Sequence, residues 1–302
     1  MIVYQANKAE FLLDFNDRDI EDVIHARYQA KTSRKVAPAE IRSWRESLGY
    51  VARVLSDPAI ADDVGVAIEF FLPQTAKRID VILAGHADDD SRRLIVVELK
   101  QWSSVDATDR DAIVLLRGGS RPDQVRIHPS YQAWSYTAFL EGFNEAVYDG
   151  GLQLRPCAYL HNYAADGVID APLYQPYIER APLFLKGDED RKRLREFIKQ
   201  HIRHGRGRQI LFDLEKGRLR PSKALADVVG KLLKGNEEFA LIDDQKMVFE
   251  AAKAACHKAN ASSKARVVII EGGPGTGKSV VAVNLLAALR EGLTVKYISK
   301  NA

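Results

Sequence analysis

The chain has 302 residues, of which 46% are hydrophobic and 28% charged, and its formal net charge at pH 7 is +3. At roughly 150 residues per domain this length predicts about two domains, each able to bury a core. No apolar run approaches the roughly 18 to 20 residues that span a bilayer, and the first residues lack the features of a secretory signal. Two cysteines, Cys157 and Cys256, exclude a disulfide framework and favour a reducing, cytoplasmic setting.

The first predicted unit covers residues 38–162 and alternates helices with strands in the order α-β-β-β-α-β. Pro38 stands in the first turn of the first helix, and apolar residues recur along one face of it. Pro73 and Gly85 end the first two strands. The order predicts a compact α/β unit with a mixed sheet. The expected helices are 38–55 and 129–146, and the expected strands are 64–71, 78–84, 94–100 and 152–160.

A basic helical connector is expected next, over residues 181–235. Between Gly187 and Gly235 there are 14 Lys and Arg residues against 7 Asp and Glu, a local excess of 7 positive charges. Such a cluster attracts phosphate backbones. The alternative is a solvated helix rich in charged residues, since RKRLREFIKQHI also places apolar residues at helical spacing.

A second unit is expected from residue 236 to the end of the chain, which leaves residues 1–180 as the first domain. We expect a helix carrying Gln245, a loop over 259–265, a strand over 267–270, a helix to about 290 and a strand over 295–299. A complete P-loop motor needs more strands, a further acidic residue and usually an arginine finger. We therefore expect this unit to be the truncated start of a P-loop ATPase, and the chain to be a fragment of a longer protein.

The strongest motif is GGPGTGKS at residues 272–279, which fits the phosphate-loop pattern G-x-x-x-x-G-K-[ST]. Glycines let the backbone N–H groups wrap around phosphate, Lys278 reaches the β and γ phosphates, and Ser279 offers a hydroxyl to Mg²⁺. An apolar strand pattern precedes the motif and an apolar helix pattern follows it. The predicted ATP-binding residues are Gly272, Gly273, Gly275, Thr276, Gly277, Lys278 and Ser279.

Gln245 lies upstream of this loop, in the stretch FALIDDQ. It resembles the adenine-reading glutamine of superfamily 1 helicases, and the resemblance implies that its amide binds the base of ATP. The alternative is an exposed glutamine at the start of a helix.

Polar residues interrupt the predicted core strands. Asp80 lies within RIDVIL, and Glu98 and Lys100 lie two apart in LIVVELKQW, on one face of a strand. This pattern resembles the PD-(D/E)XK nuclease superfamily, whose core has the same α-β-β-β-α-β order, although Ile79 stands where a proline is usual. The resemblance implies a restriction-endonuclease-like fold and a phosphodiester-cleaving site. Asp80, Glu98 and the carbonyl of Leu99 would bind Mg²⁺ or Mn²⁺, and Lys100 would orient water or stabilise charge.

Gln132 and Tyr136 lie four apart on one face of the second helix. They resemble the Q-x-x-x-Y motif of RecB-like nucleases, which borders the metal site and holds the DNA strand. The predicted catalytic set is Asp80, Glu98, Lys100, Gln132 and Tyr136.

Neighbouring polar residues leave alternatives open. Glu69 is either a further metal ligand or a residue at a sheet edge. Lys77 and Arg78 either contact phosphate or neutralise the carboxylates. His128 is expected to be structural.

Taken together, the chain from about residue 37 resembles bacterial fusions of a PD-(D/E)XK nuclease with a Schlafen group 3-like DNA/RNA helicase. The stretches FALIDDQKMVFE and VVIIEGGPGTGKSVVAVNLL carry the helicase part of the resemblance. It implies a nucleic-acid partner, DNA before RNA, cleavage coupled to ATP turnover, and a setting in defence against foreign DNA. No membrane partner is expected, and the oligomeric state stays open.

Two other function classes remain, together with a structural reading of the polar residues. The first unit could grip nucleic acid without cleaving it, or the chain could be an ATP-driven switch that docks protein partners. The polar residues on the strands could also be buried ion pairs that stabilise the sheet, although such pairs are weak evidence for stability.

Overall fold

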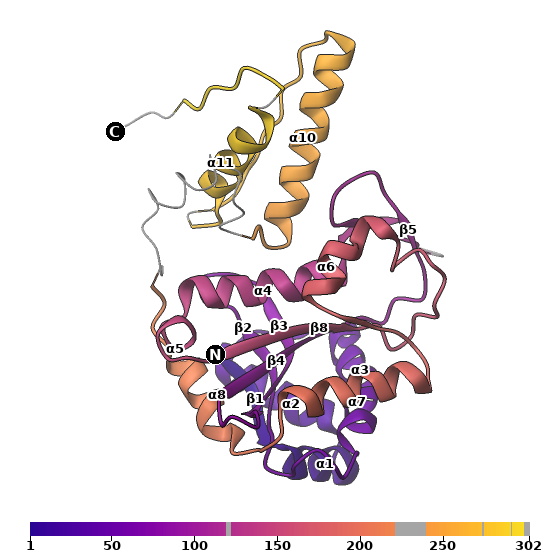
Figure 1. Ribbon diagram of the computed structural model, residues 1–302, viewed down its shortest axis with the longest axis vertical. Helices are drawn as coiled ribbons and strands as arrows, with labels where there is room; N and C mark the ends of the chain where they lie inside the picture. The colour runs from indigo at the N-terminus through magenta and orange to yellow at the C-terminus, as the bar shows by residue number, and fades with distance from the viewer. Residues whose placement is uncertain (119–121, 221–239, 274, 291, 299–302) are drawn as a thin grey trace.

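The computed structural model describes residues 1–302 except 119–121, 221–239, 274, 291 and 299–302 (Figure 1). Its centre is a six-stranded mixed sheet in the order β1-β2-β3-β4-β8-β9. The first four strands are mutually antiparallel, and β8 and β9 extend the sheet in parallel from β4. The strands are β1 (Ile2–Asn7), β2 (Gly65–Phe71), β3 (Arg78–His86), β4 (Arg92–Leu99), β8 (Gln153–Tyr159) and β9 (Leu183–Phe184).

The predicted α/β class is confirmed, and the order α3-β2-β3-β4-α4-β8 is the expected one. Helix α3 (Pro38–Leu55) has the predicted bounds, and α4 (Pro129–Phe143) ends slightly before the expected position. Strand β3 runs through Gly85 to His86, because its last residues continue to pair with the first residues of β4, up to His86 opposite Arg92. Strand β1 was not predicted.

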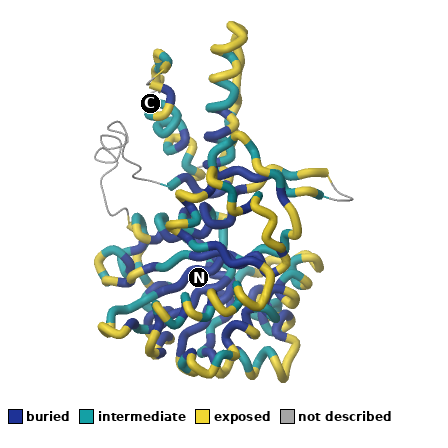
Figure 2. Tube along the Cα trace, turned by 45° about the vertical axis from the view of Figure 1, so that its right-hand side comes forward, coloured by how far each residue is buried: buried dark blue, intermediate teal, exposed yellow. Residues whose placement is uncertain are grey.

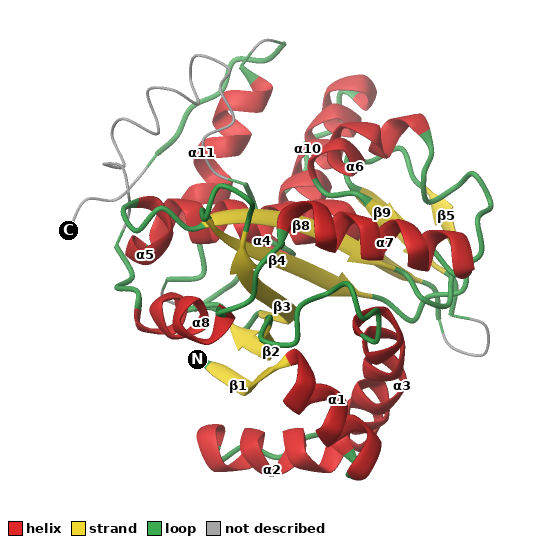
Figure 3. Cartoon of the chain, turned by 60° about the horizontal axis from the view of Figure 1, so that its bottom comes forward, coloured by secondary structure: helices red, strands yellow, loops and turns green. Residues whose placement is uncertain are grey.

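Helices cover both faces of the sheet (Figures 1 and 3). On one face, α1 (Lys8–Asp17), α2 (Ile20–Thr32), α3 and α7 (Asp188–His201) pack against strand residues such as Ile68 and Val97. On the other, α4, α5 (Glu145–Tyr148) and α8 (Gly207–Lys216) pack against Ala67 and Val96. Because successive strand residues point to opposite faces, the run LIVV in β4 supplies both cores.

Helices α7 and α8, which the sequence placed in a connector, lie against the sheet. Leu194 and Ile198 of α7 belong to one core, and Leu211 of α8 belongs to the other. Helix α8 starts in very close contact with β2, since a Cβ on Gly207 would lie 2.2 Å from the Ala84 carbonyl oxygen and 2.3 Å from the Gly65 nitrogen. The domain boundaries stay a prediction, and the connector from residue 221 to 235 lies outside the described residues.

Many basic side chains of this segment have acidic partners. Arg191 and Arg193 pair within α7, and Lys199 lies 3.4 Å from the carboxylate of Asp57. The side chains of Arg203, Arg206 and Arg208 pair with Asp88, Asp90 and Glu10. The described part of the segment therefore fits the helix rich in charged residues better than a bare phosphate-binding surface.

A second, three-stranded sheet lies beyond the carboxyl end of β4. It consists of β5 (Val105–Ala107), β6 (Ile113–Leu116) and β7 (Gln124–Ile127). The helix α6 (Gln175–Arg180) and the short 3-10 helix η1 (Pro172–Tyr174) pack beside it, with Tyr174 and Tyr177 buried. None of these elements was predicted.

Helices α10 (Asp244–Ser262) and α11 (Lys278–Leu289) stand together above α4 (Figure 1). Phe249, Val281 and Leu241 form a small core between them. The second half of α10 is largely exposed (Figure 2). No described helix has the length and apolar character required for a bilayer crossing.

Several predictions for this second region are wrong. Helix α10 continues to Ser262, through most of the loop expected at 259–265. Residues 267–270 and 295–298 form no strand, and Ser299 lies outside the described residues. No described strand lies beside residues 267–270, so the hydrogen-bonded ladder that a strand needs is missing there. Val267 and Ile269 are accordingly 87% and 79% exposed.

Candidate functional site

Three carboxylates line up across neighbouring strands of the main sheet. In the β3–β4 ladder Val81 pairs with Val97, which sets Asp80 beside Glu98. In the β2–β3 ladder Ile68 pairs with Val81 and Phe70 with Ile79, which sets Glu69 beside Asp80. The register therefore brings together residues that are far apart in the sequence.

Asp80, Glu98 and Lys100 form one contacting cluster. Lys100 Nζ lies 2.5 Å from Glu98 Oε1, which confirms that positions 98 and 100 share a face. The backbone nitrogen of Leu99 donates a 2.7 Å hydrogen bond to Asp80 Oδ2. The Lys100 backbone nitrogen donates to the Tyr159 carbonyl, so β8 fixes the end of β4.

The electrostatics of this cluster are those of buried, interacting groups. Burial and the nearby Asp80 raise the pKa of Glu98 well above its ordinary value, and burial raises the pKa of Asp80. Burial alone would lower the pKa of Lys100, but the carboxylates of Glu98 and Asp80 raise it above its ordinary value. The lysine therefore stays charged between two carboxylates whose negative charge is costly to bury.

The donor set fits a magnesium ion held largely by water and two carboxylates. Glu98 is 2% exposed, and its Oε2 has no hydrogen-bond partner among the described residues. A cavity of about 180 Å³ is lined by Asp80, Leu99 and Glu69, and Glu98 is not part of its lining. Mg²⁺ prefers such hard oxygen ligands and keeps several waters. Within the described residues no group of three or more His, Cys, Asp or Glu side chains is arranged to hold a metal.

Glu69 has partners of its own. Its Oε1 accepts a 2.8 Å hydrogen bond from the Trp44 indole, and its Oε2 lies 3.0 Å from the Arg78 guanidinium. Burial and the charge of Asp80 raise the pKa of Glu69 to about 7. The sheet-edge alternative is wrong, because β1 pairs with the far side of β2. A role as metal ligand stays a prediction.

Arg78 is one of two basic residues beside Asp80, and both pair with acidic side chains. Arg78 lies 2.5 Å from the Glu40 carboxylate as well as against Glu69. Lys77 lies 2.9 Å from Asp244 and 3.3 Å from Asp243. These contacts favour the alternative in which the two cations neutralise carboxylates.

Gln132 and Tyr136 of α4 contact each other, as their spacing predicts. The Gln132 side-chain amide donates a 2.9 Å hydrogen bond to the Tyr136 hydroxyl. That hydroxyl donates a 2.5 Å bond to Asp243 Oδ2. Burial, together with the charges of Glu98 and Asp243, raises the pKa of Tyr136, so the hydroxyl keeps its proton. Tyr136 packs in one core with Leu94 and Val96 of β4, the strand that carries Glu98, and this places the helix motif next to the strand cluster.

Asp243 was missed by the sequence analysis. It is 8% exposed, precedes α10, and has φ 39° and ψ −109°, a strained conformation for a residue other than glycine. Its charge also raises the pKa values of Glu98 and Lys100. The only signal in the sequence was the acidic pair directly before Gln245 in FALIDDQ.

His128 is structural in the described fold. It is fully buried, its Nδ1 accepts a bond from the Ser130 backbone at the start of α4, and its Nε2 lies 2.8 Å from the Ile169 carbonyl. Burial lowers its pKa to about 4.

The glycine-rich loop leads directly into α11, as predicted. Lys278 is the first residue of α11, with Ser279 next to it, and its Nζ lies 2.7 Å from the carbonyl oxygens of both Gly272 and Gly273. Gly277 has φ 85°, and a Cβ there would lie 2.3 Å from Gln245 Nε2. The loop therefore needs glycine at 277 for its conformation and for the approach of Gln245. Pro274 lies outside the described residues.

Gln245 reaches the loop across the base of α10. Its Nε2 donates a 3.1 Å bond to the Thr276 carbonyl, and its Oε1 accepts a bond from the Ile242 backbone nitrogen. Gln245 therefore lies in contact with the phosphate loop. Its contact with a base stays a prediction.

One comparison with known proteins bears on this region. Residues 265–302 are similar to the family described as Schlafen group 3, DNA/RNA helicase domain. No curated protein and no solved structure matches the chain. The similar stretch includes the phosphate loop and α11, and it relates this part of the chain to nucleic-acid-related ATPases.

Proposed function

We propose that this chain combines a metal-dependent phosphodiester-cleaving site on the main sheet with the nucleotide-binding start of a helicase-like ATPase. The observation that carries the cleavage proposal is the buried oxygen of Glu98, unpartnered among the described residues, next to Asp80 and Lys100. An unpartnered buried carboxylate oxygen is a costly feature that a bound cation would satisfy. The similarity of residues 265–302 supports the ATPase part.

The metal would supply a bound water of lowered pKa and stabilise charge on the phosphate. Asp80, Glu98 and the Leu99 carbonyl are the residues that would hold it. Lys100, kept protonated by both carboxylates, would donate hydrogen bonds to the developing negative charge. Gln132 and Tyr136, which bond to each other and to Asp243, would border this site on the adjacent helix face.

The test measures cleavage of labelled single- and double-stranded DNA, and of RNA, by the 302-residue chain with Mg²⁺, Mn²⁺ or chelator. Glu98→Gln and Asp80→Asn should abolish metal-dependent cleavage. The matched control is Glu250→Gln, because Glu250 is also a buried glutamate paired with a lysine, 2.8 Å from Lys246 Nζ, but belongs to α10.

A second readout does not depend on activity. Mn²⁺ should raise the melting temperature of the parent and of Glu250→Gln, but not that of Glu98→Gln, because only the folded site binds the ion. Equal cleavage by Glu98→Gln and the parent would refute the site. Salt-sensitive DNA binding without cleavage or metal stabilisation would favour the non-cleaving binding module instead.

A further inference from the structure

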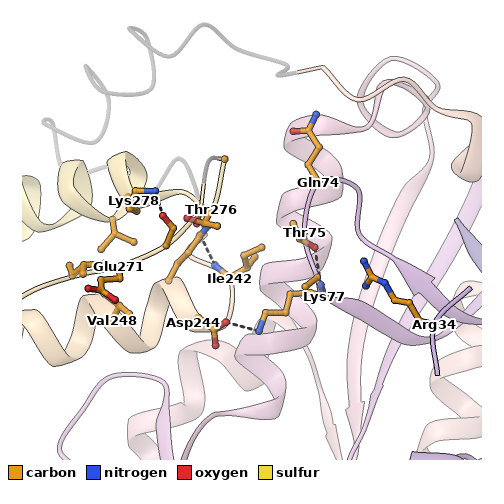
Figure 4. A pocket seen from close by; sticks show the side chains of 16 residues that line it. Arg34, Gln74, Thr75, Lys77, Ile242, Asp244, Val248, Glu271, Thr276 and Lys278 are labelled. Atoms are coloured by element: carbon orange, nitrogen blue, oxygen red, sulfur yellow. Dashed lines mark hydrogen bonds and ion pairs between the residues drawn. The ribbon is translucent and has the colours of Figure 1, made fainter. Parts of the chain in front are cut away.

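Two neighbouring cavities meet at Gln245. The first, of about 550 Å³, is lined by the phosphate loop, the start of α10 and residues 74–77 of the β2–β3 turn (Figure 4). The second, of about 360 Å³, lies between the same loop and helix α4. Both are lined by Gln74, Thr75, Ile242, Gln245 and Gly275, so the two cavities lie side by side at these residues.

The two cavities differ in chemistry. The first contains the cationic groups of Lys278, Lys77 and Arg34 together with the carboxylates of Asp244 and Glu271, and Lys77 is paired with Asp244 (Figure 4). Among the described residues, no charged side chain lines the second, whose walls include Pro73, Phe139, Phe143 and Val280. A nucleoside triphosphate has the same division, with an anionic chain at one end and a flat, largely apolar base at the other.

Phe139 and Phe143 form the aromatic wall of the second cavity. Their ring centroids are 4.9 Å apart with planes inclined by 25°, one helical turn apart on α4, and both side chains are half-buried. Gln245 stands at the entrance from the phosphate-loop side, where its amide already binds Thr276 and Ile242. An aromatic surface beside a side-chain amide is a suitable site for a nucleobase.

We propose that the base of the bound nucleotide lies in the second cavity, against Phe139 and Phe143 of the first unit, with Gln245 at its edge and the triphosphate at Lys278. This inference rests on the proposed nucleotide-binding function and adds that both units build the site. Helix α4 then carries the base wall at its carboxyl-terminal end and Gln132 and Tyr136 nearer its start.

The test compares two ligands, ATP and inorganic tripolyphosphate, which shares the anionic chain but has no base. Each is titrated with Mg²⁺ into the 302-residue chain by calorimetry. The double variant Phe139→Leu/Phe143→Leu should bind ATP about tenfold more weakly and tripolyphosphate as the parent does, since stacking acts on the base alone. Lys278→Ala should weaken both ligands.

Three further variants make the result specific. Phe139→Tyr/Phe143→Tyr keeps both rings and should restore ATP affinity to within about twofold of the parent. Phe212→Leu, on the exposed face of α8, controls for loss of a phenyl ring and should change neither affinity. Circular dichroism verifies that each variant is folded.

Each outcome has one meaning. If the parent binds ATP and the leucine variant either weakens both ligands equally or weakens neither, the proposed base wall is wrong and the phosphate site is unaffected. A parent that binds neither ligand overturns the nucleotide-binding proposal and this inference with it.

Discussion

Replacing Tyr136 by phenylalanine tests whether the segment before α10 is held by the strand-and-helix site. The change removes one hydroxyl that donates a 2.5 Å bond to the Asp243 carboxylate and accepts one from Gln132. A hydrogen bond to a charged group contributes about 1.5–3 kcal/mol, and among the described residues Asp243 then keeps its 3.3 Å ion pair with Lys77. We expect a loss of about 2–3 kcal/mol in the free energy of unfolding.

The matched control lies on the same helix. Tyr131 is equally buried, and its hydroxyl donates a 2.8 Å bond to the neutral Leu241 carbonyl. Tyr131→Phe should therefore cost only about 1 kcal/mol. In an Asp243→Asn background, where the acceptor is neutral, the cost of Tyr136→Phe should also fall to about 1 kcal/mol.

Urea unfolding followed by circular dichroism at pH 7 and 25 °C measures all five proteins. Equal costs for Tyr136→Phe and Tyr131→Phe would refute the role of the charged acceptor. An unchanged cost in the Asp243→Asn background would show that Tyr136 acts through other contacts.

Three shorter predictions concern packing, reactivity and pH. Gly207→Ala should lower the free energy of unfolding by about 2 kcal/mol or more, because the added Cβ would meet fixed backbone. Gly292→Ala, with open space around its Cβ, should change it by less than about 0.5 kcal/mol. Urea unfolding compares the two variants, and equal losses would contradict the close contact at Gly207. A thiol reagent should modify Cys256 in the folded protein and reach Cys157 only after unfolding, and two fast thiols would show that β8 is not buried. The pKa of His128 is about 4 in the folded protein against 6.5 ordinarily, so the unfolded state binds more protons as the pH falls from 6.5 towards 4. The free energy of unfolding should therefore fall by about 2 kcal/mol between neutral pH and pH 5. His128→Asn should remove this contribution, and an identical pH dependence of unfolding in both proteins would disprove it.

The elements that sequence predicted well are those whose signals are local. Pro38 and the apolar spacing that follows set the bounds of α3, and short apolar runs bounded by turn residues predicted β2, β3 and β4. The two-residue spacing of Glu98 and Lys100 predicted their contact, because strand geometry alone fixes it.

The features that sequence missed depend on distant partners. Strand β1 exists because Ile2–Asn7 pairs with β2, whose residues lie 58 to 68 positions further along the chain. Asp243 joins the site through Tyr136, which no local pattern relates to it. The run at 267–270 has the composition of a strand, but a strand also needs a neighbour to bond, and none is present among the described residues.

The close contact of Gly207 with Gly65 has a practical consequence for making shorter pieces of this protein. A fragment cut at residue 180 would lose α7 and α8 and leave Ala67, Ile82 and other apolar strand residues without their cover. Such a fragment would be prone to self-association. A cut after Gly217 retains both helices, and it is the shorter piece we would expect to purify as a monodisperse sample.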